Sequence, residues 1–241
     1  MRHGETDFNK EGKCQGNLDI HLNENGLKQA EKVSKKFILE SEPKPNLIIS
    51  STLTRAKTTA KSIHKKLEDH HKHKIPFLVT DLLQERGLGM YQGNTFKNMK
   101  EDLSKLNFQY EEFPEPRFHY CLNQISIKNE NTKIETLEEV NKRVSESIQF
   151  ILEKTFQHLI EDKDFIVSSK TPYNVIVVSH GLFLCGIIGN LILSEEKWMP
   201  VKHSNTGVSS IVLEVEEKNS IYHYKNPSIL HLNDTSHHHF E

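Results

Sequence analysis

The chain has 241 residues, with 31 basic and 33 acidic side chains and a formal net charge of -2 at pH 7. This balance argues against a general nucleic-acid-binding protein, which is usually clearly basic. The sequence contains no apolar run of the roughly 18 residues that a membrane-spanning helix needs, and its polar N-terminus does not resemble a signal peptide. Cys14, Cys121 and Cys185 are too scattered for a disulfide framework, so we expect a reducing, cytoplasmic location. No Gly/Ser-rich or Pro-rich linker divides the chain, which indicates a single domain over residues 1–241.

The N-terminus combines an arginine, a histidine and a glycine in successive positions. A phosphoryl group needs positive charge and N–H donors, and the guanidinium of Arg2 can grip two phosphate oxygens. A neutral His3 could attack phosphorus and form a covalent phospho-enzyme. Gly4 would allow a close approach of the backbone, and Asn9 could add a donor. Alone this pattern is a weak signal, and a solvated N-terminal turn explains it equally well.

The first half of the chain predicts alternating helices and strands. Residues 7–22 should form a loop, and a helix capped by Asn23 should follow. The apolar positions of this helix are Leu27, Ala30, Val33, Phe37 and Ile38. Residues 47–50 form an apolar run typical of a buried parallel strand, and a second helix should begin near Thr54. Its inward positions are Ala56, Ala60, Ile63 and Leu67.

Arg55 would therefore lie in the first turn of a helix directly after a strand. Free backbone N–H groups and the helix dipole favour anions at such a place. The alternative is that Arg55 only solvates the helix end.

Two histidine-rich segments are tempting as metal sites. The segment His70–Lys74 has no acidic or cysteine partner, so we interpret it as a solvated basic loop. The cluster Ser236–His239 receives the same interpretation, as a flexible tail.

A strand is expected at residues 76–80, followed by a glycine-rich loop over residues 81–93. In this loop Glu85 is the candidate general acid, which would protonate a leaving oxygen and later deprotonate water. The alternative for Glu85 is an ordinary surface ion pair with Arg86.

The middle of the chain predicts a short helix over residues 95–106 and an irregular stretch over residues 107–133. Arg117 and His119 in that stretch have no assigned role. Thr136 and Glu139 form a capping box, and the helix behind it should run to about residue 159. Its inward positions are Leu137, Val140, Val144, Ile148, Ile151 and Leu152.

Residues 175–178 form an apolar, β-branched run that predicts a central parallel strand buried on both faces. His180 and Gly181 follow it directly, at the end of a strand where open α/β sheets bind ligands. His180 would donate a hydrogen bond to phosphoryl oxygens as charge develops on them; the alternative is a core histidine bonded to a backbone carbonyl. A helix over residues 182–193 should follow.

Two late strands, over residues 208–215 and 220–225, are expected to finish the sheet. Between the helix and these strands, Asn205 and Thr206 would hold the loops of the site in place.

A series of short motifs occurs in the order found in a known family. They are Arg2–Thr6 with Asn9 and Gln15–Gly16, Ser50–Ala60, Leu83–Gly89, Glu135–Leu137 with Arg143, Val178–Gly181, and Asn205–Val208. This set resembles the histidine phosphatase superfamily, also called phosphoglycerate mutase-like, from position 2 to about position 230. The resemblance implies a three-layer α/β/α sandwich with a mostly parallel sheet. It also implies that an insertion at about residues 94–135 covers the pocket.

The resemblance implies hydrolysis of a phosphomonoester through a phosphohistidine, on a small phosphorylated metabolite such as a sugar bisphosphate. The implied catalytic residues are His3, Glu85 and His180, and the implied substrate-binding residues are Arg2, Asn9, Gln15, Gly16, Arg55 and Gly181. No metal or other cofactor is expected, because arginines and histidines neutralise the phosphate charge. Neither nucleic acid nor a membrane is expected as a partner.

Within the family, the chain looks most similar to fructose-2,6-bisphosphatase and to the fructose bisphosphatase that regulates glycolysis and apoptosis. The similarity lies in the spacing from Asn9 to Gln15–Gly16, in Glu85–Arg86 before a glycine, and in Glu135–Leu137. The family often has Glu-Gly where this chain has Gln92–Gly93. One alternative is a phosphoglycerate mutase. Another is a non-catalytic member that binds phospho-ligands or a partner protein.

In this family a buried strand precedes the Arg-His-Gly motif, whereas only Met1 precedes Arg2 here. A parallel sheet that lacks a central strand leaves unpaired backbone groups in the core. We therefore expect that this sequence begins inside a longer natural chain.

Overall fold

The computed structural model describes residues 1–40, 44–105, 122–127, 130–161, 172–193, 198–219 and 221–239. The helices are α1 (Asp7–Lys10), α2 (Glu24–Glu40), α3 (Thr54–His71), α4 (Phe96–Lys105), α6 (Leu137–Glu161) and α7 (Gly181–Ile192). The strands are β1 (Pro45–Ser51), β2 (Phe77–Thr80), β3 (Asn174–Val178), β4 (Val208–Lys218) and β5 (Ile221–Asp234). A further short helix covers residues 122–127. Arg117 and His119 lie outside the described residues.

Strands β1, β2 and β3 form a parallel sheet in the order β2-β1-β3. Ile48 of β1 is opposite Phe77 of β2 on one side and Ile176 of β3 on the other. Leu47, Ile48 and Ile49 are fully buried, which explains why this strand reads as a continuous apolar run.

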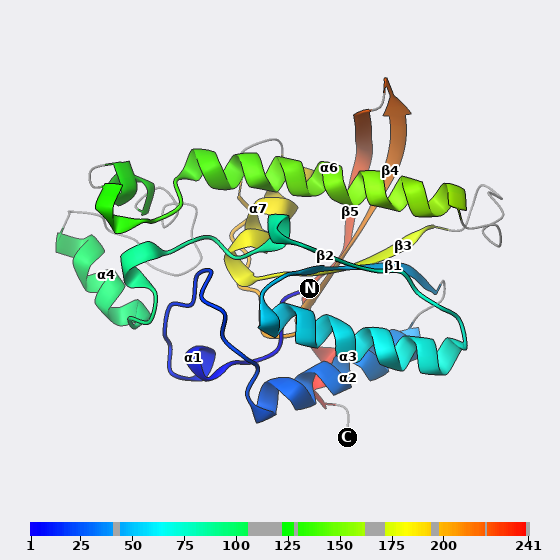
Figure 1. The fold of residues 1–241 in the computed structure, drawn as a ribbon, viewed down its shortest axis with the longest axis horizontal. Coiled ribbons are helices and arrows are strands. Elements are labelled where there is room, and N and C mark those ends of the chain that lie inside the picture. The colour runs from blue at the N-terminus through cyan, green and yellow to red at the C-terminus, as the bar shows by residue number, and fades with distance from the viewer. Residues whose placement is uncertain are drawn as a thin grey trace.

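Helices α2 and α3 lie on one side of this sheet, and α6 and α7 lie on the other (Figure 1). Because side chains alternate along a strand, Ile48 packs into the core under α2 and α3, while Leu47 and Ile49 pack under α6 and α7. The predicted three-layer α/β/α fold is confirmed. No helix among the described residues is long and apolar enough to cross a membrane.

The caps of two long helices match the sequence patterns. The side chain of Asn23 accepts from the backbone N–H of Gly26 at the start of α2 (2.8 Å). At the start of α6, the backbone N–H of Glu139 donates to Thr136, and the Glu139 carboxylate accepts from the backbone N–H of Thr136 in return. Leu27, predicted to point inward, is 49% exposed. Its helical turn packs through Gly26 against the backbone of Glu5 and not against the sheet.

Other local predictions need correction. Residues 7–22 do not form a loop throughout, because Thr6 and Asn9 cap each other and nucleate α1. The basic segment at residues 70–74 is not all loop either. Helix α3 continues through His71, and the chain leaves it at Lys72 with a left-handed backbone (φ 53°).

Strands β4 and β5 do not extend the parallel sheet as predicted; they form a separate antiparallel hairpin. β5 continues to Asp234, well beyond the predicted end at residue 225. The additional part of β5 contains Pro227; β5 pairs only with β4 in the described structure, and the pairing shifts register between Val212 and Glu214. Proline is tolerated at such an irregular, edge position.

The backbone of residues 1–3 links the two sheets. The Met1 amine donates to the carbonyl of Val177 (2.8 Å), and His3 N–H donates to the carbonyl of Ser179 (3.1 Å). On the other side, Arg2 N–H donates to the carbonyl of Gly207 (3.3 Å), just before β4. The N-terminus therefore lies in the middle of the molecule, beside the strands (Figure 1).

The C-terminal segment is not a flexible tail. Residues Ser236–His239 form a 3₁₀-helix, η4, which contacts α2. His237 in this turn is fully buried. The sequence pattern gave no indication of this docking, since its partners lie near the other end of the chain.

Candidate active site

His3 is fixed through its backbone and its ring. Its N–H donates to Ser179, and its carbonyl accepts from the N–H of Thr206 (3.2 Å). Ring Nδ1 lies 2.7 Å from the carbonyl of Gly4. A carbonyl only accepts, so Nδ1 carries the hydrogen and Nε2 presents a lone pair. Burial, together with the positive charges of Arg55 and Arg2, holds the pKa of His3 well below its ordinary value of 6.5, so the ring is neutral and nucleophilic.

His180 lies next to His3, with ring centroids 5.1 Å apart, as the sequence predicted for these two distant residues. It leaves β3 and occupies the N-cap position of α7. Nε2 lies 2.9 Å from the hydroxyl of Ser51, at the end of β1, whereas Nδ1 is buried without a partner. The alternative of a core histidine bonded to a carbonyl is not what is observed. Burial first, and then Arg55, keep the pKa of His180 well below 6.5.

Two arginines surround this histidine pair. Arg55 Nε points at His3 Nε2 (3.3 Å), and its other nitrogens donate to the carbonyls of Leu18 (2.6 Å) and Gly16 (2.7 Å). Arg2 donates to the carbonyl of His203 (2.7 Å), and its buried Nε has no partner. Burial lowers the pKa of Arg55 to about 10, which still leaves it charged at neutral pH.

Two unpartnered buried atoms belong to predicted site residues, Arg2 Nε and His180 Nδ1; the others among the described residues are both ring nitrogens of His203 and Nδ1 of His237. Buried polar atoms are nearly always hydrogen-bonded in native proteins. Two such atoms beside the His3 ring therefore indicate a place for an anion that accepts hydrogen bonds. A Cβ built on Gly181 would lie 3.6 Å from Arg2 Nε, so the glycine keeps that side of the guanidinium uncovered.

The other predicted substrate-binding residues also brace loops. Asn9 Oδ1 accepts from the backbone of Thr6 (3.2 Å) and from Asn205 (3.1 Å), and Gln15 Oε1 accepts from the Thr6 hydroxyl (3.0 Å). Gly16 has φ +53°, and a Cβ there would lie 2.2 Å from Gln92 Oε1. Because both amide oxygens are used within the protein, a substrate would meet the NH₂ groups of Asn9 and Gln15.

Gly4 has a different role from the predicted one. A Cβ on Gly4 would lie 2.6 Å from the carbonyl oxygen of Gly26. The absent side chain therefore makes room for the first turn of α2, and not for a ligand.

Glu85 closes the site from the side of α7. Its Oε1 accepts from the backbone N–H groups of Arg86 (3.0 Å) and Phe183 (2.9 Å), and its Oε2 accepts from that of Leu182 (3.1 Å). The carboxylate thus caps the helix that His180 begins. The alternative of a surface pair with Arg86 does not fit, because Arg86 is fully buried and donates to the carbonyl of Glu135.

Glu85 also lines a cavity of about 900 Å³, which lies between the loop that carries Glu85 and the start of α6. Charged side chains of both signs face this cavity, and they are Glu85, Lys133, Glu135, Glu139, Lys142, Arg143 and Glu146. Such a lining suits a small polar molecule.

The sequence did not reveal that hydrogen bonds made by Arg143 and Glu135 hold the loop that carries Glu85. Arg143 forms a two-point ion pair with Glu135 (2.9 and 2.7 Å) and donates to the carbonyl of Gln84 (2.6 Å). Glu135 accepts in turn from the N–H of Gly87 (2.9 Å). Both residues belonged to a recognised motif, but only their folded positions reveal that they clamp the loop that carries Glu85.

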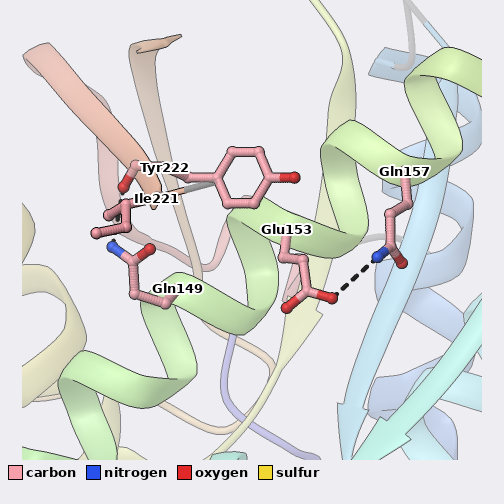
Figure 2. Close-up of a pocket in the computed structure, with 5 residues that line it drawn as sticks. All are labelled: Gln149, Glu153, Gln157, Ile221 and Tyr222. Atoms are coloured by element: carbon pink, nitrogen blue, oxygen red, sulfur yellow. Dashed lines mark hydrogen bonds between the residues drawn. The ribbon is translucent and has the colours of Figure 1, made fainter. Parts of the chain in front are cut away.

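A second cavity, of about 470 Å³, lies between α6 and β5 and is lined by Gln149, Glu153, Gln157, Ile221 and Tyr222 (Figure 2). Gln149 donates to the carbonyl of Tyr222 (2.9 Å), and Gln157 donates to Glu153 (2.9 Å). None of these lining residues is a predicted site residue. Across the described residues, no group of three or more His, Cys, Asp and Glu side chains could hold a metal ion.

Comparison with known proteins gives the same family and fold. Residues 1–226 match the model of the histidine phosphatase superfamily (branch 1). The putative phosphoserine phosphatase 2 of Hydrogenobacter thermophilus is 26% identical over 223 residues, which cover 92% of each chain. Phosphoglycerate mutase-like protein 4 of Arabidopsis thaliana is 40% identical over 97 residues, but these cover only 40% of this chain and 39% of that protein.

Among solved structures, a phosphoglycerate mutase from Bacillus anthracis superposes with a TM-score of 0.63 at 24% identity, covering 93% of this chain and 88% of that one. This likeness shows the fold. The match to the family model spans most of the chain, residues 1–226. The chain therefore belongs to branch 1 of the histidine phosphatase superfamily.

Proposed function

We propose that this protein hydrolyses a phosphate monoester of a small metabolite by transferring the phosphoryl group to His3 and then to water. The observation that carries the proposal is the neutral His3 ring, with its Nε2 lone pair beside Arg55 Nε and two unpartnered buried nitrogens. A pure phosphate binder needs the positive charges and donors but has no need of an unprotonated nucleophile or of a carboxylic acid.

In the first step Nε2 of His3 attacks phosphorus, and the bond between phosphorus and the ester oxygen breaks. Arg2, Arg55 and His180 stabilise the charge on the phosphoryl oxygens. The leaving oxygen takes a proton from Glu85 and departs as the alcohol. Oε2 of Glu85 accepts one backbone N–H bond and Oε1 accepts two, so Oε2 is the oxygen better placed to carry this proton.

In the second step water attacks phosphorus, Glu85 takes a proton from the water, and the phosphorus–nitrogen bond breaks. Inorganic phosphate is released and His3 returns to its neutral form. The arginines supply the charge neutralisation that a metal ion supplies in other phosphoryl-transfer enzymes.

We infer a small polar substrate from the mixed charges of the cavity next to Glu85. The name of the relative that covers 92% of each chain suggests phosphoserine as a first compound to test. The similarity to fructose-2,6-bisphosphatase in the Asn9 to Gln15–Gly16 spacing, in Glu85–Arg86 and in Glu135–Leu137 adds fructose-2,6-bisphosphate to the panel, and both compounds remain predictions. The cytoplasmic location also remains a prediction.

A phosphoglycerate mutase is the alternative, and the names of the relatives from Arabidopsis thaliana and Bacillus anthracis support it. The same residues would serve, and only the exclusion of water from the phosphohistidine separates the two reactions. With 3-phosphoglycerate, a rise in the 2-phospho isomer without free phosphate would favour the mutase.

The proposal is tested by phosphate release from phosphoserine, phosphoglycerates and fructose-2,6-bisphosphate. Acid-quenched labelling with the preferred ester should trap acid-labile phosphate on the native chain and none on His3→Ala. Phosphate release that persists in His3→Ala would contradict the mechanism. A chain that binds inorganic phosphate but neither releases nor traps it would be the non-catalytic member.

A further inference from the structure

The C-terminal turn η4 is anchored to α2 by lysine side chains. Lys36, with only 6% of its side chain exposed, pairs with Asp234 (2.8 Å) and donates to the hydroxyl of Ser236 (3.2 Å). Lys32 donates to the carbonyl of His238 (3.1 Å). An ion pair this buried is held in one geometry, so η4 has a defined position on the helix.

Two histidines of this turn meet at the hydroxyl of Thr206. Oγ1 of Thr206 lies 3.0 Å from Nε2 of His237 and 3.0 Å from Nε2 of His238. The same hydroxyl donates to the carbonyl of Asn205 (2.7 Å). A hydroxyl has one hydrogen and two lone pairs, so Thr206 accepts from Nε2–H of both histidines. The Nε2–H of His238 is shared with the carbonyl of Asn205, which also lies 3.0 Å away.

The backbone of Thr206 needs such support. Its φ is +57°, in the left-handed region, which a β-branched residue rarely adopts. Conformations of this kind persist only where surrounding contacts impose them, and they concentrate at functional sites. The fully buried His237 and the half-buried His238 supply two of those contacts.

The turn at Asn205 and Thr206, which η4 supports, holds the backbone of His3. The N–H of Thr206 donates to the carbonyl of His3 (3.2 Å), and the side chain of Asn205 donates to the same oxygen (3.1 Å). Asn205 also donates to Asn9 (3.1 Å), in the short helix α1 that follows His3. The backbone of His3 is therefore fixed by donors on a strained turn that η4 keeps in place.

We propose that His237 and His238 are positioning residues for His3, acting through Asn205 and Thr206. The inference rests on the proposed function, in which His3 is the nucleophile. Displacing a reacting atom by about 1 Å can slow a reaction by about 100-fold, even when the change lies far from the chemistry. His237 and His238 are thus part of the active-site support, and a metal site is not required to explain them.

The test compares His237→Leu, His237→Gln and His239→Leu in the full chain. The leucine variant removes the hydrogen bond to Thr206, the glutamine variant retains an N–H donor, and His239 is the exposed neighbour in the same turn. With p-nitrophenyl phosphate, the pre-steady-state burst of p-nitrophenol measures transfer to His3. In His237→Leu we expect the burst rate to fall by about 10-fold or more, with KM within about threefold of the native value. His237→Gln should recover most of the rate, and His239→Leu should match the native chain.

A merely structural role makes a different prediction. Circular dichroism gives the folded fraction of each variant, and a loss of burst amplitude that only follows this fraction, at an unchanged rate, would overturn the proposal. So would equal rates for His237→Leu and His239→Leu. If His237→Leu does not fold, Thr206→Ser and Thr206→Val replace it, since serine keeps the hydroxyl and valine keeps the shape. The proposal then requires valine to be the slower variant.

Failure of the proposed function is recognised separately. A native chain whose turnover of p-nitrophenyl phosphate survives His3→Ala would refute the nucleophile and leave the contacts of η4 intact. The ¹⁵N resonances of the His3 ring, assigned by their loss in His3→Ala, report the position of the ring without turnover. They should shift in His237→Leu and stay unchanged in His239→Leu; unchanged resonances in both variants would overturn the positioning role.

Discussion

The His3–His180 pair and the His237–His238 pair have similar ring spacings, with centroids 5.1 and 4.6 Å apart. Their surroundings differ. The first pair lies between two arginines and leaves His180 Nδ1 unpartnered, whereas both members of the second pair donate to one hydroxyl. One buried Nδ1 has no partner in each pair, that of His180 and that of His237, so an unpartnered nitrogen does not separate the two pairs. The first pair is distinguished by the arginines beside it and by the Nε2 lone pair of His3 that faces Arg55, whereas the second pair is held by the hydroxyl of Thr206. Ring proximity alone does not separate a reactive pair from a supporting one; the charged groups beside the rings do.

The largest effect expected from this comparison concerns His3. Replacing the nucleophile removes the covalent route, so His3→Ala should lower phosphate release by at least about 1,000-fold. His73→Ala, at an exposed histidine of the loop after α3, is the matched control and should keep the native rate. If His3→Ala retained more than a tenth of the rate, the two histidine pairs would not differ in the way proposed.

A substitution at Glu85 sharpens the comparison, because it separates the role of this residue in proton transfer from its role in capping α7. Glu85→Gln keeps an oxygen for the N–H groups of α7 but cannot donate a proton to the leaving oxygen. For a phosphate ester with an alkyl leaving group we expect a loss of about 100- to 1,000-fold in kcat. For p-nitrophenyl phosphate, whose leaving group needs no proton, the burst should change by less than about 10-fold. Equal losses with both esters would show that Glu85 only caps the helix.

A substitution at Arg55 should cause a smaller loss of activity. Arg55→Lys keeps a positive charge but loses the planar fork that contacts Gly16, Leu18 and the His3 ring. We expect kcat/KM to fall by about 100-fold. The same change at Arg117, in the stretch whose role is unassigned, is a useful comparison, and a larger loss there would move the phosphate site away from the histidine pair.

The smallest expected effect is on the pH dependence of stability, through His237 of the second pair. Burial lowers the pKa of His237 to about 4, from an ordinary value of 6.5, with His238 and Lys36 adding to the effect. The folded protein thus disfavours the protonated ring. Stability should be unaffected by His237 above pH 6.5, should decline as pH falls towards 4, and should level off below that. Thermal unfolding measured at pH 7.5 and pH 4.5 should show a drop in Tm that is smaller in His237→Gln by about 2–4 °C.

His3, His180 and His203 titrate in the same direction, and burial lowers the pKa of His203 to about 3. They are present in both the native chain and His237→Gln, so the difference between the two curves isolates His237. An identical drop in both would mean that folding does not lower the pKa of His237.

Much of the fold follows from local patterns in the sequence. The apolar run at residues 47–50 became the buried strand β1, and Thr136 and Glu139 began α6 as their spacing predicts. The positions of Arg55 and His180 after strands and at the starts of helices were also readable, because strand and helix periods depend only on near neighbours. The motif order then indicated that these residues meet.

Tertiary structure alone decided where the ends of the chain dock. His237 contacts a threonine 31 positions earlier, and Lys36 donates to a serine 200 positions later, so no local period reveals either contact. The same holds for Glu85, whose carboxylate caps a helix that starts almost a hundred positions further on. Hydrogen bonds between distant segments form only when the packed core brings their donors and acceptors together. The sequence determined which residues could do chemistry, and the packing determined which of them are free to do it.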